Sequence, residues 1–302
     1  MRISFDEVRN NKIRSWFLAF FFIILIGLLG AVAGLIYGSI LFGLILALLF
    51  GMIYSIIGFY SGNKMVLAMS GAKPVTKQEY PHLYHAVEGL AVAAGIPTPK
   101  AYVIEDSAMN AFATGRDPEH ASITVTTGLL KVMNREELEG VLAHEMSHVK
   151  NYDIRFMMLT AVLVGIVTLL SDFLLRSFLW GGHGRRNNRS EGGGSTTLIF
   201  IAIGLVLAIL SPIIGQMIKL AISRKREYMA DAGAVALTRY PPGLANALKK
   251  ISQDPDPLVD KANKATAHLF ISTPFRKKKG GMSRLFATHP PIEDRIKRLQ
   301  EM

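Results

Sequence analysis

The stretch VLAHEMSHVK, residues 141–150, runs directly into NYDIRFMMLTAVLVGIVTLL, residues 151–170. The first segment places two histidines four residues apart, with a glutamate between them, which is a pattern typical of a metal site on a helix. The second segment is mostly apolar after its first few residues, as in a helix that enters lipid. Together they predict a metal centre beside a membrane.

The residues before the histidines predict a well-formed helix. Asn134 is a good N-cap, and Glu137 three residues later completes a capping-box pattern. An apolar stripe with helical spacing follows, formed by Leu138, Val141, Leu142, Met146 and Val149. We therefore expect HEMSH to lie on one face of a helix that begins after Asn134.

The chemistry of HEMSH follows from this helical spacing. His144 and His148 are one turn apart and can reach a single ion, while Glu145 lies on the neighbouring flank, where it can take a proton from a metal-bound water. Two imidazoles and one carboxylate suit zinc, which then keeps a position for water and lowers the pKa of that water to about 7. The alternative is a chance match on an amphipathic helix.

A third ligand is predicted in REYMAD, residues 226–231. Glu227 and Asp231 are four residues apart and share a helical face. We expect Glu227 to bind the zinc and Asp231 to hold the free nitrogen of a zinc histidine by a hydrogen bond. The alternative is an ordinary solvated helix, because Lys225 and Arg226 adjoin the pair.

The apolar content predicts a membrane protein. Half of the 302 residues are hydrophobic, and no charged residue occurs from Ser15 to Gly62. That run is long enough for two spans, which we place at Trp16–Tyr37 and Ile40–Tyr60. Two weaker apolar runs follow at 156–180 and 197–220. The basic segment before the first run, and the length of that run, argue against a cleavable signal.

The charge and the cysteine count narrow the function classes. The net charge of +11 favours attraction to anionic headgroups of a lipid bilayer over binding of nucleic acid, for which we find no motif. The chain has no cysteine, which excludes disulfides, cysteine nucleophiles and thiolate metal ligands.

Short strands and a C-terminal helix complete the expected fold. AYVIE (101–105) and SITVTT (122–127) are β-branched strand candidates, with NAFATG (110–115) between them, and they predict a small, mostly antiparallel sheet. The last helix follows THPP, and its basic residues, Arg295 to Arg298, complement the helix dipole. The fold class is therefore α+β, a multi-pass α-helical membrane protein with a soluble domain of small sheet and helices.

The motifs HEMSH, SRKREYMAD, NAFATG and THPPIEDRIKRL, with four apolar runs in this order, resemble the HtpX family of membrane zinc metalloproteases, which are gluzincins related to the CAAX prenyl proteases. The resemblance covers essentially the whole chain. It implies one zinc per chain, held by His144, His148 and Glu227, with Glu145 as the catalytic base. It also implies stress response and quality-control proteolysis of damaged or misfolded membrane proteins in a prokaryotic plasma membrane.

Two further residues have weaker physical support. His289 in THPP is held beside two prolines and could donate a hydrogen bond to the oxyanion of the tetrahedral intermediate; a capping or packing role is the alternative. NAFATG could be a strand edge that pairs with an extended substrate, with Asn110 holding a substrate carbonyl; an ordinary core strand is the alternative. Other membrane quality-control proteases are candidate partners.

The zinc constrains the topology. His148 and Glu227 must meet in one coordination sphere, so the chain crosses the membrane twice or not at all between them. The N-terminus, the active site and the C-terminus then share one side, which flanking Lys and Arg residues assign to the cytoplasm. The expected organisation is a cytoplasmic N-terminus (1–15), a transmembrane hairpin (16–62), a first part of the protease domain (63–155), a second membrane hairpin (156–220) with a Gly-rich loop (181–196), and a second part of the protease domain (221–302).

Three alternatives remain. An intramembrane metalloprotease would place the histidines inside an apolar span, whereas MNREELEG is too polar for lipid. A CAAX-type prenyl endopeptidase would be expected to carry more spans. A non-catalytic scaffold or chaperone stabilised by zinc would need a fourth protein ligand, for which His289 is the candidate.

Overall fold

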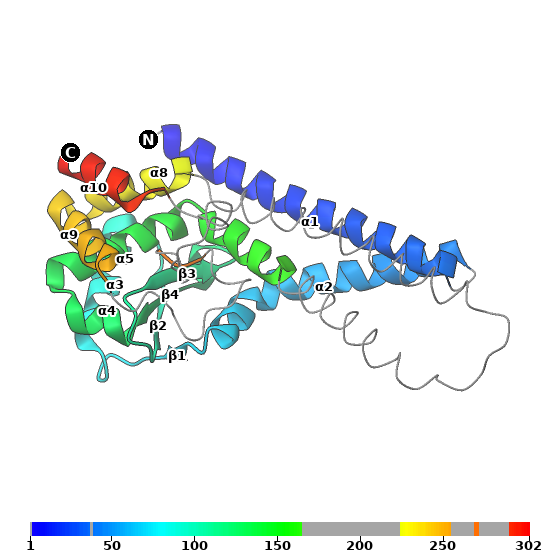
Figure 1. The fold of residues 1–302 in the computed structure, drawn as a ribbon, viewed down its shortest axis with the longest axis horizontal. Helices are drawn as coiled ribbons and strands as arrows, with labels where there is room; N and C mark the ends of the chain where they lie inside the picture. Colours follow the sequence, from blue (N-terminus) through cyan, green and yellow to red (C-terminus); the bar gives the residue numbers. More distant parts are fainter. Residues whose placement is uncertain (1, 37–38, 165–223, 255–268, 272–289) are drawn as a thin grey trace.

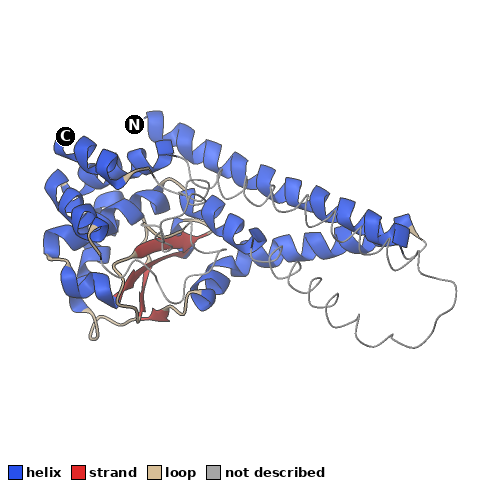
Figure 2. Ribbon diagram, in the orientation of Figure 1, coloured by secondary structure: helices blue, strands red, loops and turns tan. Residues whose placement is uncertain are grey.

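The computed structural model describes residues 2–36, 39–164, 224–254, 269–271 and 290–302. A pair of long helices projects from a domain in which shorter helices pack around a small sheet (Figures 1 and 2). The two chain termini lie at the same end of the molecule, away from the turn that joins the two long helices (Figure 1).

The long helices are α1 (Arg2–Ile36) and α2 (Ile40–Met69). Helix α1 begins well before the apolar run, so most of the polar N-terminal segment is helical. The segments Val8–Leu28 and Ile40–Met69 are long and apolar enough to cross a membrane. Almost none of the span in α2 is buried within the protein, and its exposed apolar side chains include Leu41, Phe42, Ile45, Leu46, Leu49 and Phe50. Such a surface suits contact with lipid.

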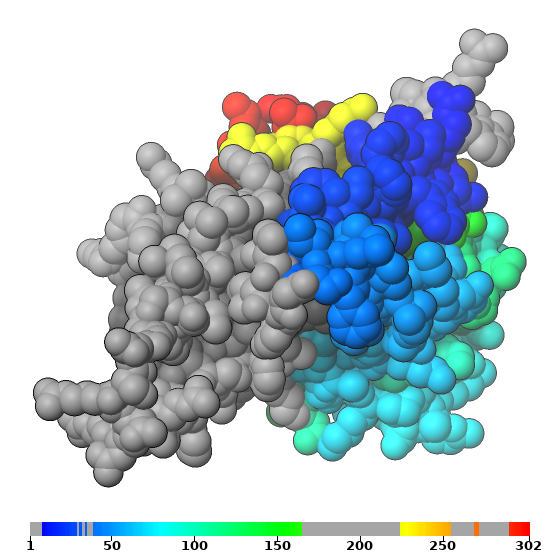
Figure 3. All heavy atoms as spheres, turned by 90° about the vertical axis from the view of Figure 1, so that its right-hand side faces the viewer, coloured from blue at the N-terminus to red at the C-terminus, as the bar shows by residue number. Residues whose placement is uncertain are grey.

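The two long helices pack closely through glycines. A side chain at Gly43 would lie 2.6 Å from Cα of Gly34 on the other helix. The missing side chains let the two backbones approach, as in membrane helix pairs. In a space-filling view from the turn end, α1 and α2 lie side by side (Figure 3). Of the expected second membrane hairpin (156–220), residues 156–164 are helical, in a helix that begins at Asp153, and residues 165–220 lie outside the described residues.

The sheet has four strands in the order β1-β2-β4-β3, namely β1 (Lys73–Pro74), β2 (Lys100–Ile104), β3 (Ala111–Gly115) and β4 (Ala121–Thr126). The β1–β2 and β3–β4 pairs are antiparallel, in line with the prediction, while β2 and β4 are parallel. The parallel pair was not foreseen. It arises because the chain places β3 beyond β4 and then returns through the short helix η1 (Pro118–His120).

Helix α5 (Arg135–Lys150) occupies the centre of the domain that contains the sheet, and it contacts β3, β4 and α3 (Pro81–Ala94). Its capping box is confirmed: the Asn134 side chain accepts a hydrogen bond from the backbone of Glu137, whose carboxylate accepts one in return. The short helix α4 (Thr127–Val132) connects the sheet to this region.

The C-terminal part of the chain packs on α5 from the other side. Helices α8 (Arg224–Thr238) and α9 (Pro241–Ser252) both contact α5, and α10 (Ile292–Gln300) packs on α8 and α9 (Figure 1). Segments before and after the 165–223 region therefore form one core, which brings residues far apart in the sequence together at α5.

Candidate metal centre

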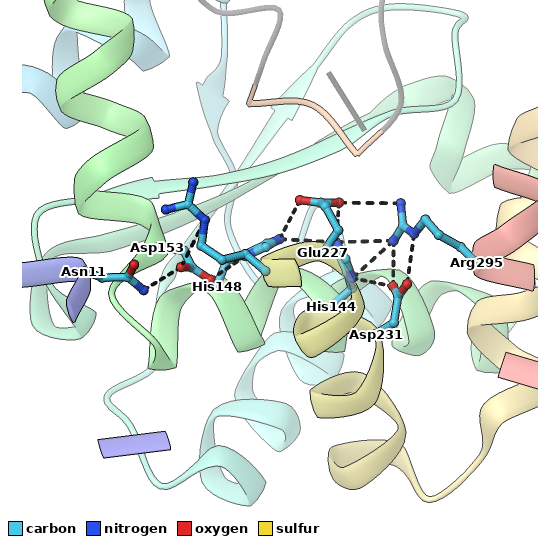
Figure 4. A network of polar contacts seen from close by, with 8 residues as sticks. Asn11, His144, His148, Asp153, Glu227, Asp231 and Arg295 are labelled. Carbon is cyan, nitrogen blue, oxygen red and sulfur yellow. Dashed lines mark hydrogen bonds and ion pairs between the residues drawn. The ribbon is translucent and has the colours of Figure 1, made fainter. Parts of the chain in front are cut away.

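Three buried side chains from α5 and α8 converge on one point. His144 and His148 of α5 place their Nε2 atoms 3.3 Å apart. The Glu227 carboxylate of α8 faces both, with Oε2 3.7 Å from Nε2 of His144 and Oε1 3.6 Å from Nε2 of His148. All three side chains are buried. The structure thus brings together the three residues that the sequence predicted as zinc ligands (Figure 4).

The spacing of these donor atoms fits a tetrahedral metal. Ligands at about 2.1 Å from zinc in tetrahedral geometry stand about 3.4 Å from one another. One donor atom from each of the three side chains lies within 4.8 Å of the others. Two imidazole nitrogens and one carboxylate are a donor set that zinc accepts, and it leaves a coordination position for water. The residues present therefore fit the expected metal.

A carboxylate holds the far side of the first histidine. Asp231 lies one turn beyond Glu227 on α8, and its Oδ1 is 3.0 Å from Nδ1 of His144. Arg295 of α10, which is fully buried, donates two hydrogen bonds to Asp231, of 2.7 and 3.0 Å. Its Nη1 also lies 3.7 Å from Glu227. Asp231 therefore contacts His144, and Arg295 fixes Asp231 in turn.

A second carboxylate holds the other histidine. Asp153 begins the helix that follows α5, and its Oδ2 is 2.9 Å from Nδ1 of His148. Asn11 of α1 donates a hydrogen bond of 2.6 Å to the other oxygen of Asp153. Each histidine is thus oriented by a carboxylate that is itself held by a further side chain (Figure 4).

Glu145 lies in the same buried region. Burial raises its pKa to about 7, although the charge of His148 and a hydrogen bond from the Ala113 backbone of β3 act in the other direction. A carboxyl group with a pKa near neutrality is suited to exchanging protons.

The two histidines differ in their affinity for protons. Burial, together with the charge of Arg295, lowers the pKa of His144 to about 4. Burial also acts to lower the pKa of His148, but the hydrogen bond and charge of Asp153 outweigh it and raise that pKa to about 9. Burial opposes ionisation of Asp231, but Arg295 and His144 together hold its pKa at about 2.

The other predicted site residues are not placed at this centre by the described contacts. Asn110 directly precedes β3, is buried, and its side-chain oxygen accepts a hydrogen bond of 3.1 Å from the Ala111 backbone. Strand β3 is the last strand in the sheet order, and the Ala111 carbonyl accepts a hydrogen bond of 2.9 Å from Ile271. His289 lies outside the described residues.

Sequence reasoning missed Asp153, Arg295 and Asn11. Asp153 is five residues after His148, and a search for a carboxylate close to the second histidine would have found it. Arg295 was expected only to complement the helix dipole, and it was not foreseen that this residue is fully buried in an ion pair with Asp231. Asn11 carries no local signal, since it precedes the apolar run in an ordinary polar segment.

The chain is similar to known peptidases. Residues 77–302 match the profile of peptidase family M48. The chain is 44% identical over 299 residues to a Protease HtpX homolog of Streptococcus gordonii, with 99% of both chains covered. It is 46% identical over 298 residues to a Protease HtpX homolog of Dictyoglomus thermophilum, covering 99% of this chain and 94% of the relative.

A solved structure shares the fold. The crystal structure of S. mikatae Ste24p aligns with a TM-score of 0.51 and 21% identity, over 97% of this chain and 66% of that chain.

Proposed function

This chain belongs to peptidase family M48, and from that premise we propose that it is a zinc-dependent endopeptidase that cleaves misfolded or damaged membrane proteins at the cytoplasmic face of a prokaryotic plasma membrane. The family match and the similarity to HtpX proteases support a metallopeptidase. The identity of the metal, the class of substrate and the side of the membrane are the proposed parts.

One observation carries the proposal. Buried side chains of α5 and α8, which lie far apart in the sequence, present three donor atoms within 4.8 Å of one another. The cost of burying such polar groups is large unless they are paired or bind a metal. A bound divalent cation would offset this cost, because it neutralises the charge of the Glu227 carboxylate and binds the imidazole nitrogens.

Zinc is the metal that suits this donor set, and when bound it would act as a Lewis acid on the scissile carbonyl and on water. His144, His148 and Glu227 would hold it. Asp231 and Asp153 accept hydrogen bonds from the Nδ1 atoms of the two histidines, which keeps each Nε2 as the metal-facing donor.

Glu145 would move the protons. We infer that it accepts a proton from the attacking water and later donates it to the leaving amine. Its burial and its pKa of about 7 support this role, because a group that titrates near neutral pH can accept and release a proton in one cycle. His289 remains the proposed donor to the oxyanion.

Substrate binding along β3 also remains a proposal. An extended substrate would add a strand to the sheet edge, and Asn110 would hold a substrate carbonyl through its amide donor. Because Ile271 already donates to the Ala111 carbonyl, a substrate strand would either displace residues 269–271 or pair with the remainder of β3.

Membrane proteins are the proposed substrates because the metal site adjoins the apolar hairpin. The helix of residues 153–164, which begins at Asp153 beside His148, packs on α2. Side chains at Gly58 and Gly62 of α2 would lie 3.1 Å from Val162 and Met158, respectively. A segment emerging from lipid along α2 would therefore arrive near the catalytic side chains. Other quality-control proteases remain proposed partners.

The proposal is tested with Glu145→Gln in the full chain, purified in detergent and assayed on an unfolded membrane protein. We expect cleavage to fall by about 10²–10⁴-fold, since general base catalysis is lost, while one zinc per chain is retained. Glu139→Gln is the matched control on the same helix. Glu139 pairs with the exposed side chain of Arg135, and an ion pair of this kind contributes little, so its loss should leave cleavage unchanged.

Chelation distinguishes the remaining alternatives. A chelator should abolish wild-type cleavage, and added zinc should restore it. A purified protein without stoichiometric metal would overturn the zinc site, and a Glu145→Gln variant with wild-type cleavage would overturn the role of Glu145. A wild-type protein that binds zinc but cleaves no substrate would favour the non-catalytic scaffold. Cleavage of a prenylated CAAX peptide, but not of the membrane protein, would favour the prenyl endopeptidase.

A further inference from the structure

The first membrane helix reaches the metal site through one residue. Asn11 of α1 is completely buried, and its amide nitrogen donates to Oδ1 of Asp153 at 2.6 Å and to the carbonyl of Asn151 at 3.0 Å. The Asn151 carbonyl and the Asp153 carboxylate can only accept hydrogen bonds, so the NH₂ group of the Asn11 amide, and not its oxygen, must face them. The side-chain oxygen Oδ1 of Asn11 has no partner among the described residues. The polar contacts of this side chain with those residues are therefore those of its amide nitrogen.

Asp153, the partner of Asn11, also contacts His148, a proposed zinc ligand. Oδ2 of Asp153 is 2.9 Å from Nδ1 of His148, and Nε2 of that ring is 3.6 Å from Glu227. The three side chains Asn11, Asp153 and His148 therefore form a continuous line from α1 to the candidate metal position (Figure 4). Arg226 is a further charged group near Asp153, with its Nε 3.9 Å from Oδ1.

The surrounding turn is also docked on α1. Tyr152, between Asn151 and Asp153, has a positive φ of 61°, which is unusual for a residue with a side chain. Lys12, next to Asn11, places its Nζ 4.3 Å from the centre of the Tyr152 ring. The turn that carries Asp153 is thus held by successive residues of α1.

We propose that Asn11 is a positioning residue of the metal site, which acts through Asp153 to orient His148, so that the membrane helix α1 completes the outer shell of the centre. This inference rests on the proposed zinc site. Asn11 lies outside the segment, 77–302, that matches the family profile. The peptidase domain of this chain would therefore depend on its membrane helix for metal retention as well as for anchoring.

The expected effect follows from the hydrogen bonds. Without the Asn11 donor, one oxygen of the Asp153 carboxylate loses its 2.6 Å partner in a buried position. The carboxylate then becomes free to turn away from His148. Loss of outer-shell partners typically weakens metal binding by about 10–100-fold, and we expect about tenfold for a residue one step further out.

The test measures metal rather than activity. Full-length wild type and Asn11→Leu, in detergent, are loaded with zinc and titrated with a chelator, and the rate of metal release is followed. We expect release to be about tenfold faster for Asn11→Leu. In cobalt-substituted protein the visible absorption of the ion should change, because the orientation of the His148 ring changes. Asn11→Ala, which removes the carboxamide without adding bulk, is measured as well in case Asn11→Leu does not fold.

Ser15→Ala is the matched control. Ser15 lies one turn further along α1, is also buried, and its hydroxyl donates to the main-chain carbonyl of Asn11 at 2.8 Å. Ser15→Ala therefore removes a buried hydroxyl beside Asn11 and leaves the Asn11 side-chain amide and its contact with Asp153 in place. We expect its metal release and cobalt spectrum to equal those of the wild type. Equal acceleration in Ser15→Ala would show a general loosening of α1 and would overturn the specific role of Asn11.

A double-mutant cycle identifies the route of the effect. If Asn11 acts through Asp153, then Asn11→Leu should change metal release by less than about twofold in an Asp153→Ala background. A tenfold effect in both backgrounds, or none in the wild-type background, would overturn the inference while leaving the zinc site intact. A wild-type protein that binds no stoichiometric metal would instead overturn the proposed function.

Discussion

At the scale of single residues, the centre pairs each histidine with its own carboxylate. The sequence predicted Asp231 in this role without specifying the histidine, and the structure places it beside His144. Asp153 does the same for His148. The two pairs differ in their outer partner, because Arg295 compensates the charge of Asp231 whereas Asn11 offers Asp153 a neutral donor. Burial and the charge of Arg295 lower the pKa of His144, whereas the hydrogen bond and charge of Asp153 outweigh burial and raise the pKa of His148.

The pH dependence of cleavage should report the ionisation of Glu145. A general base must be deprotonated, so activity is present above its pKa and falls about tenfold per pH unit below it. Burial raises that pKa to about 7, and a bound cation lowers it again by attraction. We therefore expect the acid limb of kcat/KM to have its midpoint at or below about pH 7.

The measurement is a pH profile of kcat/KM with the metal content determined at each pH. This control separates protonation of Glu145 from metal loss. An acid limb with a midpoint clearly above pH 7 at full metal occupancy would contradict the assignment.

At the scale of elements, α5 joins the sheet with α3 on one side to α8 and α9 on the other. Gly140 of α5 lies against α9, and a side chain there would come within 2.6 Å of the Leu244 backbone nitrogen. The absence of a side chain thus permits the close approach of the two helices. This approach matters for the site because Gly140 is one turn before His144.

Gly140→Ala should therefore destabilise the protein and loosen the metal site. Forcing α5 and α9 apart should cost about 1–3 kcal/mol, and zinc should be released faster to a chelator. Thermal unfolding in detergent and the rate of metal release measure the two effects.

Gly89→Ala provides the comparison within a helix. No atom in the described part of the chain lies within 4 Å of a side chain placed at Gly89 of α3, so alanine should stabilise the helix by up to about 1 kcal/mol. Equal unfolding temperatures for the two alanine variants would argue against tight packing at Gly140.

At the scale of the whole molecule, both termini and the metal centre lie at one end, and the turn between α1 and α2 lies at the other (Figure 1). The contact between Asn11 and Asp153 ties the start of α1 to the site. If the hairpin spans the membrane, the N-terminus and the centre must be on the same side. The basic residues that flank the hairpin favour the cytoplasm.

Single cysteines test this sidedness, because the chain has none of its own. Ser39→Cys lies at the hairpin turn and Val92→Cys lies on α3, where the side chain is 77% exposed. In spheroplasts, a membrane-impermeant maleimide should label Ser39→Cys directly, but Val92→Cys only after permeabilisation. The unmodified chain is the blank, and the reverse pattern would place the centre outside.

Much of this architecture was predictable because it depends on local periodicity. A helix repeats every 3.6 residues, so the spacing of His144 and His148, and that of Glu227 and Asp231, decides which side chains share a face. The lack of charge over forty-eight consecutive residues, 15–62, likewise requires an apolar environment. The sequence by itself therefore determined the predicted donor set and the apolar hairpin.

Only the tertiary structure decided what surrounds those donors. Asn11 meets Asp153 across 142 positions, and Arg295 meets Asp231 across 64. The parallel pairing of β2 with β4 likewise depends on where the chain places β3. Polar residues such as Asn11 and Arg295 look the same in a sequence whether they are solvated or buried. Their role is set by which distant group removes them from water, and no local pattern encodes that partner.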